Sequence, residues 1–67
     1  MANRMTQRDL ILGYLIRHGS ITPLKADAEF GVKRLASRID ELRDRYNIDT
    51  IYCKSDSGKR YAEYVID

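Results

Sequence analysis

The sequence has few of the residues that build covalent or metal-bound frameworks. Its 67 residues include a single cysteine, Cys53, and a single histidine, His18. One cysteine cannot form an internal disulfide, and these two residues leave too few soft ligands for a structural zinc site. We therefore expect a reducing compartment, no metal and no other cofactor.

Long apolar segments are also missing. No apolar run approaches the roughly 20 residues that span a bilayer, and the N-terminus lacks the apolar region and cleavage site of a secretory signal. The sequence also lacks internal repeats and a glycine-rich phosphate loop. We expect a soluble, cytoplasmic protein without membrane contact. A single domain is expected because so short a chain buries only roughly 60% of its unfolded surface, which leaves no room for an enclosed substrate pocket.

Convincing catalytic constellations are absent as well. His18 would end a helix and interact with its last carbonyl groups, a position that argues against pairing with a serine or cysteine nucleophile. Asp40, Glu41 and Asp44 could hold a hard cation in pairs. An exposed helical pair without further oxygen ligands binds weakly, however, so a solvated acidic face is favoured. We expect no enzymatic activity.

The segment from Val32 to Tyr46 is the one around which the chain is organised. Leu35, Ile39, Leu42 and Tyr46 recur at i, i+4, i+7 and i+11. This spacing places all four side chains on one stripe of a helix, and that stripe must be buried. The segment therefore predicts an amphipathic helix over residues 32–46.

The other face of this predicted helix carries cations in its first two turns. Lys33 and Ser37 fall opposite the buried stripe, and Arg34 and Arg38 flank it. Phosphates and base edges suit such a face. The simpler alternative is a solvated surface, because the three carboxylates share the outer face further along the helix.

A helix is also predicted over residues 7–18. Thr6 and Asp9 form a capping pair at its start, and Gly19 ends it. Its apolar residues run almost all the way round, which is rare for a surface helix of a small monomer. Either the C-terminal strand or the segment 1–5 covers the second apolar face, or this face forms a homodimer contact.

The next helix begins with strong signals. Thr22 caps it and Pro23 occupies its first position. Ala26 is a small residue on its inner face, where the following helix crosses closely. Gly31 then allows the positive φ of a sharp turn. Two helices joined so tightly form a helix-turn-helix.

The C-terminal third predicts a β-hairpin. Residues 48–54 and 59–66 are rich in β-branched and aromatic residues and enclose a turn of serine, aspartate and glycine. Both faces of the second strand carry apolar residues, and we favour the face with Tyr64 as the core side. Three cations cluster at the hairpin tip: Lys54, Lys59 and Arg60.

The predicted order is α+β: helix 7–18, short strand 20–22, helix 23–30, helix 32–46 and hairpin 48–66. In this order the chain resembles a winged helix-turn-helix domain. The strings G-S-I-T-P-L-K-A, F-G-V-K-R-L-A-S-R-I-D-E-L-R and G-K-R-Y-A-E-Y-V-I resemble small winged-helix DNA-binding proteins of bacteriophages and prophages. The resemblance implies that 32–46 is the recognition helix and 56–60 the wing. Such motifs commonly have glycine where Phe30 stands, so we expect the turn to be shifted by one residue, to Gly31.

We therefore predict sequence-specific binding of double-stranded DNA, by a regulator of transcription or a recombination directionality factor in a bacterial cytoplasm. Four residues would enter the major groove, and three would hold an adjacent phosphate or the minor groove: Lys33, Arg34, Ser37 and Arg38, then Lys54, Lys59 and Arg60. The alternative is a protein-interaction module, such as a phage-encoded inhibitor of a host defence or transcription complex. The modest net charge of +2 and the carboxylates of the helix favour it.

Overall fold

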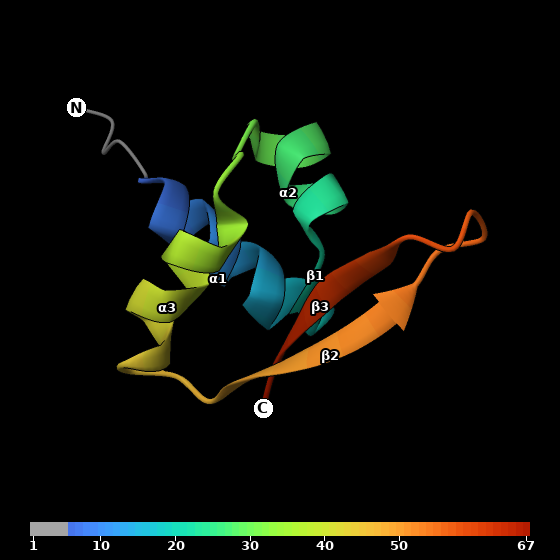
Figure 1. Ribbon diagram of the computed structural model, residues 1–67. Coiled ribbons are helices and arrows are strands. Elements are labelled where there is room, and N and C mark those ends of the chain that lie inside the picture. The colour runs from blue at the N-terminus through green and yellow to red at the C-terminus, as the bar shows by residue number, and fades with distance from the viewer. Residues whose placement is uncertain (1–5) are drawn as a thin grey trace.

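Three helices pack against one side of a three-stranded antiparallel sheet in the computed structural model, which describes residues 6–67 (Figure 1). The elements in chain order are α1 (Gln7–His18), β1 (Ser20–Ile21), α2 (Pro23–Phe30), α3 (Leu35–Arg43), β2 (Ile48–Lys54) and β3 (Arg60–Ile66). This order confirms the predicted α+β fold with a C-terminal hairpin. Among the described residues, no helix is long and apolar enough to cross a membrane.

The predicted bounds and caps of α1 are confirmed. The Thr6 hydroxyl accepts a hydrogen bond from the Asp9 N–H at 3.1 Å, and the Asp9 carboxylate accepts one from the Thr6 N–H at 3.3 Å. Gly19 ends the helix with a left-handed φ of 86°. Because α1 contacts α2, α3, β1 and β3, the rest of the fold, including the C-terminal strand, covers much of its apolar surface. Ile16 remains 66% exposed. The prediction that residues 1–5 cover α1 lies outside the described residues.

The turn between α2 and α3 is closed by backbone geometry. Gly31 has a left-handed φ of 67°, and its N–H donates to the Asp27 carbonyl at 2.9 Å. The Val32 N–H donates to the Ala26 carbonyl at 3.3 Å, and the Val32 side chain is only 1% exposed. The predicted shift of the turn to Gly31 is therefore confirmed.

The helix predicted over residues 32–46 starts later than predicted. The sequence pattern indicated residues 32–46, but α3 begins at Leu35. Val32 must reach the core from the turn, so the chain cannot yet be helical there. Lys33 and Arg34 consequently precede the helix, and Arg34 occupies its N-cap position without a side-chain cap. The predicted strand 20–22 is likewise shorter, since Thr22 caps α2 instead of extending β1.

The same helix also ends early. After Arg43 the chain tightens into a turn in which the N–H groups of Arg45 and Tyr46 both donate to the Leu42 carbonyl. Tyr46 is 38% exposed and does not complete the buried stripe. The stripe consists of Leu35, Ile39 and Leu42, which are all buried.

β3 is the central strand of the sheet, in the order β1-β3-β2. Tyr64 pairs with Ile21 on one side and Thr50 on the other. It is 8% exposed and faces the helices, as the sequence favoured.

Beyond the helices the hairpin projects freely (Figure 1). The core consists of Ile11, Leu15, Ile21, Ala26, Val32, Leu35, Ile39, Leu42, Ile48 and Tyr64.

Arg43 fastens the start of β2 to α3. Its Nε donates to the Ile48 carbonyl at 3.2 Å, and its Nη2 donates to the Thr50 hydroxyl. The guanidinium carbon also lies 5.9 Å from the centre of the Tyr64 ring, within the range of a cation–π contact. The root of the hairpin is thereby held against the helices.

We predict that Ile39→Ala destabilises the domain by about 2 to 5 kcal/mol, because it leaves a cavity at a fully buried site. In a domain with a stability of about 5 kcal/mol this would leave much of the protein unfolded. Urea denaturation measures the change. Ser37→Ala, an exposed position on the same helix, is the control and should stay within about 0.5 kcal/mol of wild type. Equal losses in the two variants would contradict the assigned helix face.

Candidate nucleic-acid interface

The turn and the start of α3 bring three predicted site residues together. Lys33, Arg34 and Ser37 are all exposed, and they line one hollow with Pro23 and Tyr64. We call this hollow the turn depression. The first N–H groups of α3 have no side-chain cap, so the helix start adds positive potential beside the two cations.

An acidic neighbour moderates the charge of this depression. The Lys33 ammonium lies 2.8 Å from the Asp27 carboxylate, and their side chains are 78% and 44% exposed. An ion pair this exposed contributes at most about 1 kcal/mol. A phosphate can therefore replace Asp27 as the partner of Lys33 at little cost.

The predicted cations of the wing lie on a well-closed hairpin. Lys54 and Arg60 face each other in register, and Lys59 directly precedes the strand. The Ser55 N–H donates to the Lys59 carbonyl at 2.8 Å, while the Ser55 hydroxyl accepts from the Lys59 N–H at 3.2 Å. Gly58 supplies the left-handed residue of the turn with a φ of 86°. All three cations are exposed.

A groove of about 670 Å³ joins the wing to the turn. Its walls are Thr22 to Leu24, Asp27, Val32 and Lys33 on one side and Ser55 and Lys59 to Tyr61 on the other. We call it the wing groove. Lys33 lines both the turn depression and the wing groove, and Arg60 lines both the wing groove and a smaller hollow that includes Lys54. Six of the seven predicted residues thus border three adjoining hollows, and the seventh, Arg38, does not.

Arg38 lies on the α1 side of α3. Its Nη2 is 3.3 Å from one oxygen of Glu41, and the other oxygen of Glu41 is 3.8 Å from Nη1 of Arg8 on α1. The Arg38 side chain is 31% exposed, and its Nε is buried without a hydrogen-bond partner among the described residues. Glu41 and helix packing thus occupy Arg38, whereas Arg34 is exposed and has no ion pair within residues 6–67.

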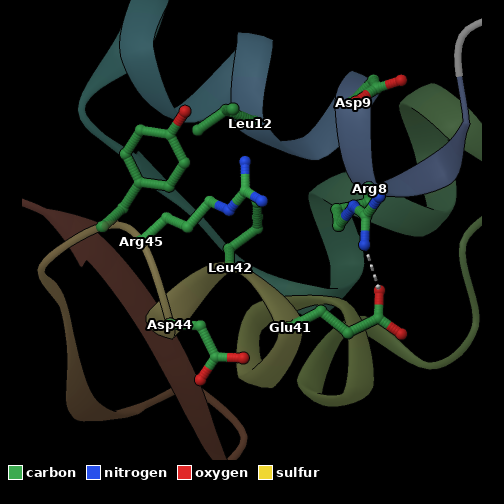
Figure 2. Close-up of a pocket in the computed structure, with 8 residues that line it drawn as sticks. Arg8, Asp9, Leu12, Glu41, Leu42, Asp44 and Arg45 are labelled. Carbon is green, nitrogen blue, oxygen red and sulfur yellow. Dashed lines mark ion pairs between the residues drawn. The ribbon is translucent and has the colours of Figure 1, made fainter.

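The second half of α3 and its surroundings carry mixed charge. Figure 2 shows the hollow between α1 and the C-terminal end of α3, in which Arg8 pairs with Glu41. Asp9, Asp44 and Arg45 line this hollow too. It therefore contains three carboxylates and two guanidinium groups. This balance does not favour an anionic ligand. A polyanion would therefore approach α3 at its N-terminal end.

Three exposed side chains at these hollows were not among the predicted site residues. Leu24 is 81% exposed and Tyr61 39% exposed in the wing groove, and Tyr52 is 78% exposed beside Lys54. The strand alternation could have placed Tyr52 on the same face as Lys54. Electrostatic repulsion by Cys53 raises the pKa of Tyr61 above its ordinary 10.0. Desolvation, a hydrogen bond to Cys53, and the charges of Glu63 and Asp56 contribute less. Tyr61 is accordingly neutral near pH 7.

Residues 6–67 match the family described as winged helix-turn-helix domain, and the chain belongs to this family. Domains of this class are typically DNA-binding modules without enzymatic activity, so the family indicates DNA as the partner. No curated protein and no solved structure matches the chain.

We predict different effects on stability from the two arginines of this region. Arg34→Ala should stay within about 0.5 kcal/mol of wild type, because the side chain is exposed and makes no cap. Arg38→Ala should lose about 0.5 to 1 kcal/mol through its pair with Glu41 and the packing of its stem. Urea midpoints measure both. An unfolded Arg34→Ala variant would show that the exposed face is misassigned.

Proposed function

We propose that this domain binds double-stranded DNA in a sequence-specific manner. One observation carries the proposal: the turn depression, the wing groove and the smaller hollow beside Lys54 adjoin one another. Together they are lined by cations from two distant parts of the chain. Base edges would meet Arg34 and Ser37, with Lys33 beside them. Lys54, Lys59 and Arg60 would hold an adjacent phosphate or the minor groove.

The charge distribution supports an approach with the N-terminal end of α3 first. Asp40, Glu41 and Asp44 are exposed further along the helix and would repel phosphates if the whole helix lay in the groove. Lys33 and Arg34 stand ahead of the helix, where an inserted tip meets the bases first. Arg38 would contribute less, because it must first release Glu41.

The biological role that we propose is that of a small phage- or prophage-type regulator. It would control transcription or the direction of recombination in the cytoplasm of a bacterial host. The strings that resemble phage winged-helix proteins support this role.

A polarisation titration against a labelled random duplex at two salt concentrations tests DNA binding directly. Nonspecific electrostatic binding should be visible below about 100 μM at low salt and should weaken as salt rises. A folded protein that binds no duplex under these conditions would contradict the proposal.

The wing should make contacts that do not depend on sequence. We predict that Lys59→Ala and Arg60→Ala weaken cognate and random duplexes about equally, because each loses one phosphate contact. Each should reduce the slope of log affinity against log salt by about 0.9, since one fewer counterion is released. If Arg60 instead reads the minor groove, its variant should also lose preference for A·T-rich flanks. Unchanged slopes in both variants would argue against a wing on the backbone.

Arg34 should behave as a reader of bases. We predict that Arg34→Ala costs about 1 to 3 kcal/mol at a site selected from random DNA and relaxes the sequence preference there. Arg17→Ala removes a cation at the end of α1, away from the three hollows, and is the matched control. Selection of binding sites with both variants measures the effect. An equal loss on all sequences would assign Arg34 to a phosphate instead.

A second candidate function is inhibition of a host protein complex through the acidic face of α3. The exposed carboxylates of Asp40, Glu41 and Asp44 favour it, since they would suit a basic protein surface. This reading requires that the protein bind its partner with duplex DNA absent. Charge reversal at Asp40 and Asp44 should then abolish the interaction, while the wing variants should leave it intact.

We also propose a homodimer through α1, centred on Ile16. This side chain is 66% exposed, whereas the other apolar side chains of α1 are buried or half-buried. We predict that sedimentation at high micromolar concentration shows a dimer and that Ile16→Glu shifts it to monomer. Leu24→Glu, at a leucine of α2 that is even more exposed, should leave the dimer unchanged. A wild-type protein that stays monomeric would overturn this proposal. A dimer would read two half-sites about one helical turn of DNA apart.

A further inference from the structure

The edge of β3 toward α2 is open over part of its length. Backbone hydrogen bonds join the pairs 47–67 and 55–59 across the hairpin, since the Asp67 N–H donates to the Asn47 carbonyl at 2.9 Å and the Ser55 N–H to the Lys59 carbonyl at 2.8 Å. The even-numbered residues of β3 therefore point their backbone groups away from β2. The Ile66 N–H confirms this phase, because it donates to the Gly19 carbonyl on the β1 side at 3.1 Å.

β1 is too short to cover this edge. It ends at Ile21, which pairs with Tyr64, and Thr22 and Pro23 then turn the chain into α2. Within residues 6–67 no strand lies beside the outward backbone groups of Ala62 and Arg60. Arg60 lines the wing groove, and Ala62 directly follows Tyr61, which lines it too.

The side chains of the wing groove are chemically suited to a peptide. Pro23, Leu24, Val32 and Tyr61 give it apolar walls, and Leu24 is 81% exposed. An uncovered apolar wall of this kind is typical of protein-binding surfaces. At the rim, Lys33, Lys59 and Arg60 stand against one carboxylate, Asp27. The excess of cations favours an acidic ligand.

We propose that the wing groove binds an extended acidic peptide, which adds to β3 as a strand in line with β1. Backbone groups of the peptide would pair with those of Ala62 and Arg60, in the mode known as strand addition. One apolar side chain of the peptide would pack against Leu24 and Tyr61. Its carboxylates would meet Lys33, Lys59 and Arg60.

The proposal goes beyond DNA binding and does not rest on it. A sugar-phosphate backbone needs the cations of the rim, but it uses neither the apolar walls nor the open strand edge. The two ligands share Lys33, Lys59 and Arg60, so a bound peptide would displace duplex DNA from the wing. An acidic partner segment would then act as an antagonist of DNA binding.

The test uses the full chain and a fluorescent hexapeptide of alternating aspartate or glutamate and valine. Two control peptides have the same sequence with N-methyl groups on alternate amides, one on the odd-numbered residues and the other on the even-numbered residues. Only one of the two loses the N–H groups that would pair with β3. We expect polarisation to show binding of the unmodified peptide and a loss of at least about tenfold for one methylated peptide. Amide resonances of Arg60 and Ala62 should shift on titration. Equal binding of both methylated peptides would overturn strand addition.

Two variants locate the site. Ala62→Pro removes an N–H that points away from β2, so it breaks no hydrogen bond of the hairpin and should weaken the peptide about tenfold. Leu24→Ser, at an exposed side chain, should weaken it without loss of stability. Arg34→Ala, outside the wing groove, should leave peptide affinity unchanged.

Duplex DNA measured on the same variants separates this inference from the proposed function. Loss of DNA binding in Leu24→Ser with unchanged peptide affinity would overturn the inference and assign the wing groove to DNA. Peptide binding in a protein that binds no duplex would support the inference and contradict the DNA proposal alone.

Discussion

The left-handed turn at Gly31, with Val32 anchored in the core, is the constraint on which the rest of the structure depends. The φ of 67° lets α2 end abruptly, and burial of Val32 fixes the direction in which the chain leaves. Lys33 and Arg34 must then point outward, because the next core contact is Leu35. A hydrophobic anchor and a backbone angle thus direct two charges outward, and within residues 6–67 only the Lys33 side chain of the two is paired there, with Asp27.

The sequence was sufficient to predict much of this fold because its start and stop signals are local. Each start and stop of α1 and α2 is set by residues close to it in sequence. Thr6 with Asp9 and Thr22 with Pro23 start these two helices, and Gly19 and Gly31 end them. The bounds of α3 were predicted wrongly because they depend on tertiary packing. Periodicity cannot show that Val32 is buried from a turn, or that the chain tightens before Tyr46.

The candidate site was predictable only in part for the same reason. A helical wheel treats Arg34 and Arg38 as equivalent flanks of one stripe. The structure separates them, because Arg38 meets Glu41 beside Arg8, a residue distant in sequence. The wing groove could not be predicted at all, since its two walls come from residues 22–33 and 55–61 and depend on how short β1 is.

The three contacts of Arg43 have a consequence for solubility. An open outer strand is a template on which further copies can pair, and a long apolar one is an aggregation hazard. Arg43 occupies the Ile48 carbonyl, a backbone acceptor that a new strand at the start of β2 would need, and its side chain also contacts the Thr50 hydroxyl. At the other end of the same strand Lys54 places a charge on the edge. The exposed Ile51 and Tyr52 therefore lie between two cationic side chains, which disfavour the pairing of a second copy along this edge.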